Sequence, residues 1–547
     1  MSRALSRCRL LRWLMTFCCL LAIGACDRRD QELSVQAEDA PPAAGDTILI
    51  GSGADAVTLL PVLASDSTSA DINGLVYNGL VRYDKNLEIE GVLAESWEVS
   101  EDNRVLTFHL RRDVLWHDGA PFTADDVLFT YELLVDPETP TAYADRYRQV
   151  AEAQVLDRYT FRVRYYEPLA PALISWAFPV HPRHLLEGVE LTRTTLASRP
   201  VGTGPYRLVD WRRGERIVLE ANPDYFEGPP YIHRVLYRVI PDSTTMFLEL
   251  QSGGLDYMGL TPLQYAMQTD TPAFRRRFRK YRYPAFAYTY LGYNLQRPLF
   301  QDRRVRQALS YAIDKQEIID GVLLGLGQVA DGPYTPGSWV HHPQLRQYDY
   351  NPGRARELLA EAGWSDGNGD GFLERDGRPL AFTIVTNQGN DQRVKAGEII
   401  QRRLAEVGVQ VRLRVVEWAT FLNEFINPGN FDATILGWSG GIDPDVYNVW
   451  HSSKTGPGEL NFIGFKNEEV DELLEQGRRT FDLQERQRIY RRFQEILAEE
   501  QPYTFLYVPE SLPVVAARFR GIEPAPAGIM YNFIRWYVPA EEQKYHR

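Results

Sequence analysis

The chain has 547 residues, of which 44% are hydrophobic and 24% charged, and a length of this size predicts about three to four domains or lobes. This composition is typical of globular proteins and argues against a disordered or collagen-like chain. The formal net charge is −13, and no basic arm follows the first residues. Such an acidic body is a poor match for phosphate backbones, so we expect no nucleic-acid partner.

The first 25 residues have the pattern of a secretory signal. Residues 1–12 are rich in Arg, and residues 13–25 are apolar or small. A helix of that apolar length reaches only about 20 Å, which is less than the roughly 30 Å hydrocarbon core of a membrane. A basic start, a short apolar run and small residues before a cleavage site therefore predict a signal peptide over residues 1–25.

The segment Ile23-Gly24-Ala25-Cys26 resembles a bacterial lipobox. The resemblance implies that the Cys26 thiol is acylated and that cleavage precedes it, and two or more acyl chains give a stable membrane anchor. Simple cleavage, with Cys26 as an incidental thiol, is the alternative. All four Cys lie within the first 26 residues, so the cleaved chain would hold no disulfide. Residues 26–45 are polar and rich in Ala and Pro, which predicts a flexible tether.

Helix and strand patterns alternate along the body without internal repeats, which predicts an α/β fold with mixed sheets covered by helices. No segment after residue 45 has the length and apolarity of a membrane span. Strands are predicted within 97–110 on both sides of a turn, and at 206–209, 216–219, 235–240, 409–415, 432–436 and 503–508. Helices are predicted after Thr123, after Asp242, and over 302–324, 352–362, 394–407, 468–477 and 483–499.

Three of these helices have clear local signals. Thr123 is a predicted N-cap, with Asp126 at the third helical position in a capping-box arrangement. Asn351 is an N-cap followed by Pro352 at the first helical position. The apolar positions of residues 302–324 recur at the spacing of one helix face, which predicts a single long amphipathic helix.

Several stretches spread over residues 48–508 become informative when they are taken together. They are LAESW (93–97), LWHDGAPFTADDV (115–127), GTGPY (202–206), NPDYF (222–226), YN (293–294), FQDRRVRQAL (300–309), AIDK (312–315), GWS (437–439) and DPD (443–445). In this order they resemble the extracellular solute-binding proteins of the dipeptide/oligopeptide/nickel class, family 5, which are receptors of ABC importers. The number of matches in one order makes the resemblance specific.

The resemblance implies a two-lobed, periplasmic-binding-protein-like fold (type II, cluster C) with mixed sheets and an extra subdomain. Its expected divisions are the signal peptide 1–25, the lipidated Cys and tether 26–45, lobe I over 46–82, 200–293 and 505–547, the extra subdomain of lobe I over 83–199, and lobe II over 294–504. The chain would cross between the lobes near Tyr293-Asn294 and near Gln501-Pro502-Tyr503. Closure of the lobes about these crossings would enclose the ligand.

The implied function is that of a lipid-anchored, monomeric receptor that captures a peptide or a solute of similar size and delivers it to the transmembrane subunits of an ABC permease. We expect no enzymatic activity and no cofactor. The protein would lie on the periplasmic face of the inner membrane in a Gram-negative host, and otherwise on the outer face of the cell membrane. The alternatives are the same fold binding an oligosaccharide, opine or metal chelate, a sensory adaptor for a membrane kinase, and, less favoured, an exported hydrolase.

The main candidate site is the segment after the predicted strand 432–436, because open α/β sheets place ligands at the carboxyl ends of their strands. Glycines there would let the backbone approach and pair with an extended ligand. The candidate ligand-binding residues are Ala56, Asn294, Trp438, Ser439, Gly440, Gly441, Asp443 and Asp445, of which Ala56 and Asn294 follow from the resemblance. Trp438 is a predicted pocket wall, with a core position as the alternative.

One departure from the family concerns how the ligand amine is held. In peptide-binding relatives an Asp shortly after this Trp often holds the α-ammonium of the ligand, whereas here Gly440 and Gly441 occupy that place. Asp443 or Asp445 could substitute for it, or could cap the turn that follows. Recognition of a free amino terminus is therefore an open question from the sequence.

Two motifs suggest other chemistry. The segment 437–441 matches the nucleophile elbow of hydrolases, but that motif needs a helix beginning at Ser439, which Gly440, Gly441 and Pro444 oppose. Asp366, Asn368 and Asp370 match the first half of a calcium loop, but the twelfth position is Gly377 instead of Glu. We therefore predict no metal site, with this loop as a weak calcium candidate and a solvent turn as the simpler interpretation.

Overall fold

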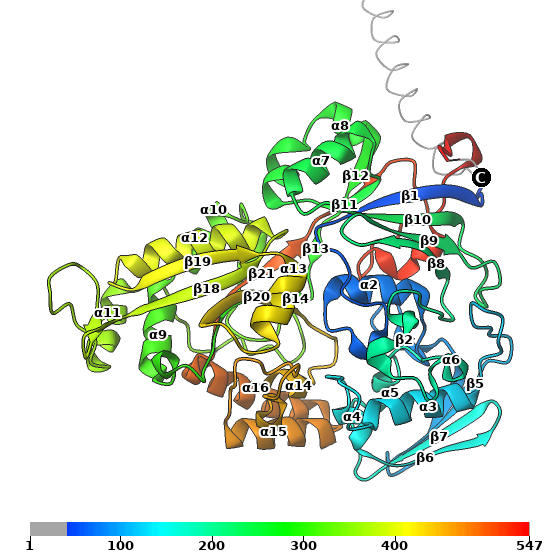
Figure 1. The fold of residues 1–547 in the computed structure, drawn as a ribbon, viewed down its shortest axis with the longest axis horizontal. Coiled ribbons are helices and arrows are strands. Elements are labelled where there is room, and N and C mark those ends of the chain that lie inside the picture. Colours follow the sequence, from blue (N-terminus) through cyan, green and yellow to red (C-terminus); the bar gives the residue numbers. More distant parts are fainter. Residues whose placement is uncertain (1–40, 546–547) are drawn as a thin grey trace, which may run out of the picture.

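The structure, a computed structural model, describes residues 41–545 (Figure 1). The predicted signal peptide over 1–25, Cys26 and the tether up to residue 40 lie outside the described residues. Within 41–545, no helix is both long enough and apolar enough to span a bilayer. The first and last described residues lie side by side. The amide of Lys544 donates to the Asp46 carboxylate over 3.2 Å.

A seven-stranded mixed sheet forms the core of lobe I, with β1 (Gly45–Ser52) at its centre. Buried and partly buried residues alternate along β1, as expected for a half-buried strand: Asp46, Ile48 and Ile50 are buried. The order of the strands is β12 (Phe278–Lys280), β22 (Pro513–Ala516), β11 (Tyr257–Gly259), β1, β10 (Ile232–Val239), β9 (Arg216–Ala221) and β8 (Tyr206–Arg212). Strands from the beginning, middle and end of the chain therefore share one sheet.

Helix α2 (Ser67–Val76) packs its buried side chains into the core of this lobe. Its N-cap is Asp66, whose carboxylate accepts the amide of Ser69 over 2.9 Å. The returning chain passes very close to the last turn of α2, since the amide of Gly204 donates to the carbonyl of Val76 over 2.8 Å. A Cβ added to Gly202 would lie 1.9 Å from the same carbonyl oxygen, so only glycine fits there.

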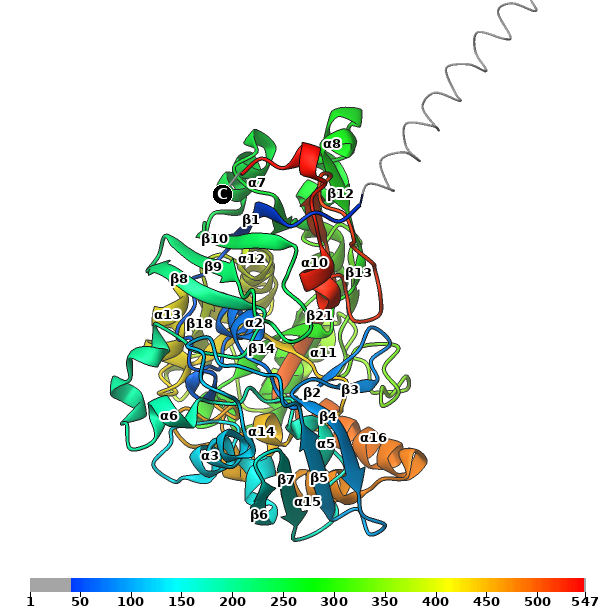
Figure 2. The ribbon, with the colours of Figure 1, turned by 90° about the vertical axis from the view of Figure 1, so that its right-hand side faces the viewer.

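The extra subdomain is built on a four-stranded antiparallel sheet, in the order β4 (Ala94–Val99), β5 (Val105–Leu110), β7 (Thr160–Tyr165) and β6 (Val150–Asp157). Helix α3 (Ala124–Val135) begins after Thr123, and the Asp126 carboxylate accepts the Thr123 amide over 2.9 Å, which confirms the predicted capping box. Trp116 and Phe122 are buried in its core. Figures 1 and 2 both show this sheet at the opposite end of lobe I from β1.

Lobe II is a second mixed sheet with helices on both faces. Its order is β13 (Tyr283–Pro284), β21 (Tyr503–Ser511), β14 (Ala287–Tyr293), β20 (Ala433–Ser439), β18 (Ala381–Asn387) and β19 (Gln410–Val416), with β15 (Gly327–Val329) on β21. One face packs on α9 (Arg303–Ala312), α10 (Lys315–Gly321), α11 (Pro352–Glu361) and α12 (Asp391–Ala405), and the other on α14 (Tyr447–Trp450), α15 (Glu468–Arg479) and α16 (Leu483–Glu500). The alternation along β14 fits this arrangement, because Leu291 and Tyr293 join the first core and Tyr288 and Tyr290 the second.

The prediction of a single helix over residues 302–324 is wrong. The chain forms α9 and α10 instead, with Ile313 in an extended conformation between them. The Asp314 carboxylate accepts the amide of Glu317 over 2.9 Å and so caps α10. A side chain that bonds nearby backbone amides competes with the continuous helix, and the apolar spacing alone did not reveal this competition.

The predicted crossings between the lobes also differ from the structure. The expected divisions place β14 and residues 505–511 of β21 in lobe I, but both strands pair within the lobe II sheet, β14 with β20 along its whole length. The connections therefore lie before Ala287 and after Ser511, where β13 and the end of β21 run side by side. The two lobes are joined by a pair of extended strands.

The close passage of Gly202 beside α2 gives a test of this packing. We expect Gly202→Ala to lower the free energy of unfolding by about 3 kcal/mol, because its Cβ would collide with the backbone of Val76. Gly74→Ala is the matched control, since nothing lies within 4 Å of its added Cβ, and alanine in a helix should raise stability by about 0.5–1 kcal/mol. Urea denaturation measures both, and equal stability of the two variants would contradict the described packing.

Candidate functional site

A cavity of about 1490 Å³ lies between the lobes. Small-molecule pockets usually measure roughly 300–1,000 Å³, so this one has room for a longer ligand. Its lining includes residues 52–54 and 64–68 of lobe I, residues Tyr143, Arg146 and Phe178 of the subdomain, and residues 333–340, 387–390 and 436–446 of lobe II. All three parts of the chain therefore contribute walls.

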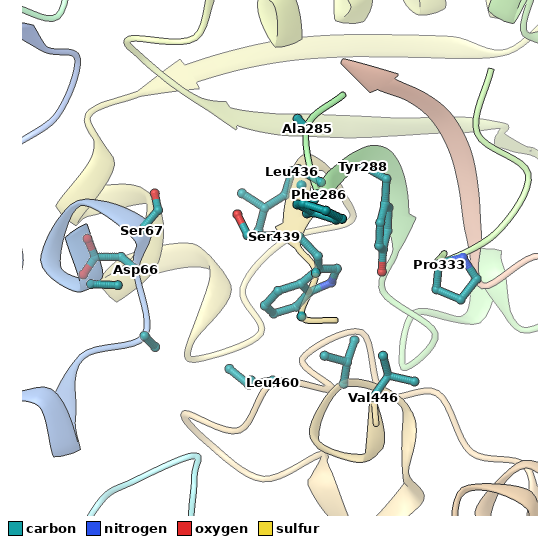
Figure 3. A pocket seen from close by; sticks show the side chains of 18 of the residues that line it. Asp66, Ser67, Ala285, Phe286, Tyr288, Pro333, Leu436, Ser439, Val446 and Leu460 are labelled. Carbon is teal, nitrogen blue, oxygen red and sulfur yellow. The ribbon is translucent and has the colours of Figure 1, made fainter. Parts of the chain in front are cut away.

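The lobe II wall contains several aromatic side chains. Figure 3 shows Phe286, Tyr288 and Ser439 around one open space, with Pro333 and Val446 on its rim. Trp438 also lines the cavity, where its indole N–H donates to the Tyr503 hydroxyl over 3.3 Å. The indole is only partly buried, so one part of the ring is anchored while another is open to the cavity.

The glycines after Trp438 leave the backbone uncovered. The amide of Gly440 donates to the carbonyl of Phe286 over 2.6 Å, which extends the pairing of β14 and β20 by one residue. A Cβ added to Gly440 or Gly441 would meet no atom closer than 3.7 Å. Packing within the protein therefore does not require glycine at these positions, and their effect is to keep free the space beside the backbone.

Asp443 is held by an arginine of its own lobe. Both guanidinium nitrogens Nη1 and Nη2 of Arg486 donate to its carboxylate over 2.9 Å. The same carboxylate accepts the amide of Asp445 over 2.9 Å. The structure thus gives Asp443 a partner and a turn-capping role inside the protein.

The side chain of Asp445 is fully buried and joins two parts of the chain. Arg478 of lobe II donates to one carboxylate oxygen over 2.9 Å, and Arg146 of the subdomain donates to the other over 2.8 Å. Burial alone would raise the pKa of Asp445, but the two arginines lower it well below its ordinary value. The carboxylate therefore stays ionised at any pH near neutrality.

Other contacts cross the cleft beside this pair. The ammonium of Lys454 in lobe II lies 2.7 Å from the carboxylate of Asp145 in the subdomain. The amide of Ala170 donates to the carbonyl of Arg478 over 2.7 Å. On the other side of the cavity the hydroxyl of Ser243 in lobe I donates to the Asp391 carboxylate of lobe II. The structure is therefore a closed conformation, with the subdomain and lobe I both touching lobe II.

Most of the sequence-predicted site residues come together in this cavity, namely Trp438, Ser439, Gly440, Gly441, Asp443 and Asp445. The structure does not bring Ala56 or Asn294 to the lining. Ala56 is 2% exposed, and its carbonyl accepts from Arg213 over 2.9 Å. The Asn294 side chain donates to the carbonyls of Gly429 and Phe431 and so organises the backbone of lobe II.

Sequence reasoning missed the cations of the cleft. Arg146 lies 299 positions from its partner Asp445 along the chain, on α4 (Asp145–Arg148), and no local pattern connects them. Arg393 also lines the cavity, near the start of α12. The signal for Arg393 was its place shortly after the end of strand β18 at Asn387, at the same sheet edge as the segment 437–445.

The two motifs that suggested other chemistry do not form such sites. Ser439 is the last residue of β20, and the next helix begins only at Tyr447, so the helix that a nucleophile elbow needs is missing at Ser439. In the exposed loop of Asp366, Asn368 and Asp370, the Asp366 carboxylate accepts the amides of Gly369 and Gly371 over 2.7 and 3.0 Å, as in a solvent turn. Among the described residues no group of three or more His, Cys, Asp or Glu is arranged to hold a metal ion.

Known proteins match nearly the whole chain. Residues 88–459 match the family described as "Bacterial extracellular solute-binding proteins, family 5 Middle". The oligopeptide-binding protein AppA of Bacillus subtilis is 32% identical over 529 residues, which cover 94% of this chain and 96% of AppA. The structure of AppA in complex with a nonapeptide has a TM-score of 0.87 and covers 91% of this chain and 100% of that one.

Two further structures have similar folds. The periplasmic binding protein DppA of Helicobacter pylori, in complex with peptide STSA, is 27% identical with a TM-score of 0.82, covering 93% of this chain and 100% of that one. NikZ of Campylobacter jejuni, in complex with Ni(L-His), is 28% identical with a TM-score of 0.81, covering 90% and 99%. These matches confirm the predicted two-lobed α/β fold and the predicted absence of an enzymatic role, and the chain belongs to family 5 of the bacterial extracellular solute-binding proteins.

Proposed function

We propose that this protein captures a peptide, or another solute of similar length, in the cavity between its lobes and delivers it unaltered to the transmembrane subunits of an ABC permease. The observation that carries the proposal is the 1490 Å³ cavity with walls from lobe I, the subdomain and lobe II. A ligand held by all three parts stabilises the closed form relative to the open one. The permease would then engage that closed form.

The size of the cavity supports a peptide over a smaller ligand. Relatives of this chain are described with a nonapeptide, with peptide STSA and with Ni(L-His), so the fold alone does not choose among them. The uncovered backbone at Gly440 and Gly441 suits an extended chain, which can pair with it while its side chains point to the aromatic wall. Exclusion of water by closure strengthens such hydrogen bonds.

We also propose that the mature protein is a monomer tethered to the membrane by acylated Cys26. The lipobox-like segment Ile23-Gly24-Ala25-Cys26 supports this anchor. The described chain starts at lobe I, beside the C-terminal residues, at the Gly45 end of β1, whereas Ser52 at the other end of this strand lines the cavity. A tether at that place leaves the mouth of the cleft free for the ligand.

The capture role is tested with protein lacking residues 1–25 and a mixture of synthetic tetrapeptides to nonapeptides. We expect mass spectrometry after gel filtration to find retained peptides of unchanged mass. Small-angle scattering should show a smaller radius of gyration at saturation, because binding favours the closed form. Peptides that emerge cleaved, or a failure to retain any peptide, would contradict the proposal.

The closed form should depend on the ion pair that joins the subdomain to lobe II. Arg146→Gln removes a charge-assisted hydrogen bond to the buried Asp445 carboxylate, so we expect peptide binding to weaken by about 1–2 kcal/mol, or roughly fivefold to thirtyfold. Arg148→Gln is the matched control, because Arg148 is on the same helix but exposed. Titration calorimetry measures both, and equal affinities would show that the pair does not favour closure.

The pH dependence of this pair follows from the lowered pKa of Asp445. A carboxylate whose pKa is lowered in the closed form contributes stability above its unperturbed pKa of about 4 and loses it only as the pH falls further. The difference in affinity between Arg146→Gln and the unchanged protein should therefore be the same at about pH 7 and about pH 5. A difference that disappears at the lower pH would contradict the assignment of Asp445 as the ionised partner.

The anchor is tested by Cys26→Ser in the full-length protein. We expect the variant to move from the membrane fraction to the soluble fraction after centrifugation, because acylation needs the thiol. Cys19→Ser, within the apolar run of the predicted signal, is the matched control and should stay with the membrane. If Cys26→Ser remains fully membrane-bound, another anchor is responsible.

A further inference from the structure

One short segment of lobe I is strongly basic, although the chain as a whole is acidic. Residues 275–282, RRRFRKYR, contain six Arg or Lys and no acid, whereas the whole chain has a net charge of −13. Arg275 pairs with Asp270, and Arg282 pairs with Glu510. The other four cations of the segment form no ion pair with an acid of the described chain. The segment therefore leaves unneutralised positive charge on lobe I.

This basic segment lies at one end of the molecule. It begins in α8 (Pro272–Arg277), which packs on α7 (Ser243–Ser252) through Phe274 and Phe247, whose ring centroids are 6.2 Å apart. Figures 1 and 2 both show α7 and α8 at the same end of the molecule as the C-terminus, opposite the sheet of the subdomain. The basic segment is thus far from the sheet that closes the cleft from below.

A second cavity, of about 340 Å³, connects the basic segment to the two ends of the described chain. Lys544 lines this cavity, and its amide donates to Asp46 near the first described residues. The charged side chains of the lining are five cations and two acids, namely Arg276, Arg277, Arg518, Arg520 and Lys544 with Asp256 and Glu542. Positive charge therefore exceeds negative charge in this lining.

The cations of this second cavity divide into two groups. The guanidinium of Arg518 is buried and pairs with Asp46 and Asp256 of the protein. In contrast, Arg276 is exposed, and Arg277 donates to a backbone carbonyl, that of Gln251, over 2.8 Å. The side chain of Lys544 is 48% exposed and lies 3.9 Å from the Asp256 carboxylate. Three cations at the rim can therefore contact an external anion.

A neighbouring helical turn, η4 (Gln264–Gln268), adds exposed apolar side chains to this end of lobe I. Leu263, directly before the turn, is 44% exposed, and Met267 within it is 73% exposed. The ammonium of Lys280 donates to the carbonyl of Tyr265 over 2.9 Å, so the basic segment contacts the same turn. Large apolar side chains beside cations are typical of protein surfaces that meet the headgroup region of a bilayer.

The length of chain before the described residues keeps this end of lobe I near a membrane. Residue 41 follows Cys26 by 15 positions, and 15 residues span at most about 50 Å in any conformation. With the acyl anchor proposed above, the second cavity stays within reach of the bilayer. Each Lys or Arg near an anionic membrane surface strengthens association by about fivefold.

We propose that this end of lobe I is a membrane-contact surface, whose 340 Å³ cavity takes the phosphate of an anionic lipid headgroup while Leu263 and Met267 enter the interface. The inference goes beyond the capture role and uses the proposed anchor only to place the surface near the bilayer. A contact of this kind is reversible, so it orients the anchored protein instead of holding it. Cations on the edge strand β12 also oppose pairing with another chain, and the experiments separate that role from lipid binding.

The first experiment uses residues 26–547 with Cys26→Ser, which cannot be acylated. Cosedimentation measures its binding to vesicles of phosphatidylcholine alone or mixed with an equal part of phosphatidylglycerol. We expect at least about tenfold stronger binding to the mixed vesicles, and a loss of binding in high salt, because ions screen the attraction. The protein should stay in the supernatant without vesicles, which excludes self-association. Equal or absent binding to both kinds of vesicle would overturn the proposal.

Paired variants assign the binding to the rim of the second cavity. Arg276→Gln with Lys544→Gln should weaken binding to the mixed vesicles by roughly tenfold or more, at about fivefold for each cation. Arg412→Gln with Lys395→Gln is the matched control, because it removes two exposed cations from lobe II. The control should bind as the unchanged protein does, and thermal unfolding checks that both pairs fold. Equal weakening in the two pairs would mean attraction by overall charge and would overturn the assignment.

The apolar part of the surface has its own variant. Met267→Gln keeps the size of the side chain but should weaken vesicle binding by about threefold or more, because a polar group no longer gains from the interface. Leu483→Gln at the start of α16 is the matched control, since Leu483 is 64% exposed on lobe II. Unchanged binding of Met267→Gln would overturn the placement of this turn at the bilayer.

Inorganic phosphate distinguishes a lipid surface from a site for free phosphate. We expect added phosphate to release the protein from mixed vesicles no better than chloride of equal ionic strength. Saturable phosphate binding in calorimetry, lost in Arg276→Gln with Lys544→Gln and found without vesicle binding, would assign the cavity to free phosphate and overturn the proposal. Because the protein used carries no acyl chain, failure of the Cys26 anchor and failure of this surface are separate results.

Discussion

The cleft is organised by one buried carboxylate, that of Asp445, between an arginine of each half of the molecule. Its removal from water is costly and is offset only when both Arg146 and Arg478 are in place. Arg478 belongs to the same lobe as Asp445, so that part of the contact is permanent. Arg146 reaches it from the subdomain, so that part of the contact joins the two halves of the molecule across the cleft. The same interaction therefore fixes the geometry of lobe II and favours closure.

This arrangement also decides what the cleft can offer a ligand. Asp443 and Asp445 line the cavity, but their carboxylates pair with arginines of the protein, namely Arg486, Arg478 and Arg146. What remains free beside them is backbone at Gly440 and Gly441 and the aromatic wall around Trp438. Neither surface is specific for a particular ligand side chain. Binding through backbone and adaptable apolar contact suits a receptor for varied peptides.

The sequence predicted what depends on neighbouring residues and missed what depends on distant ones. Thr123 with Asp126, and Asn351 with Pro352, begin helices as predicted, because a cap is decided within four residues. The segment 437–445 was found for a similar reason, since a strand end is visible locally. The extension of β20 to Ser439 depends on pairing with β14, and the pairing of Asp445 depends on Arg146, 299 positions away. Neither partner can be identified from a local pattern, so the sequence left open whether the two acids contact a ligand or cap a turn, and it did not reveal that arginines neutralise them.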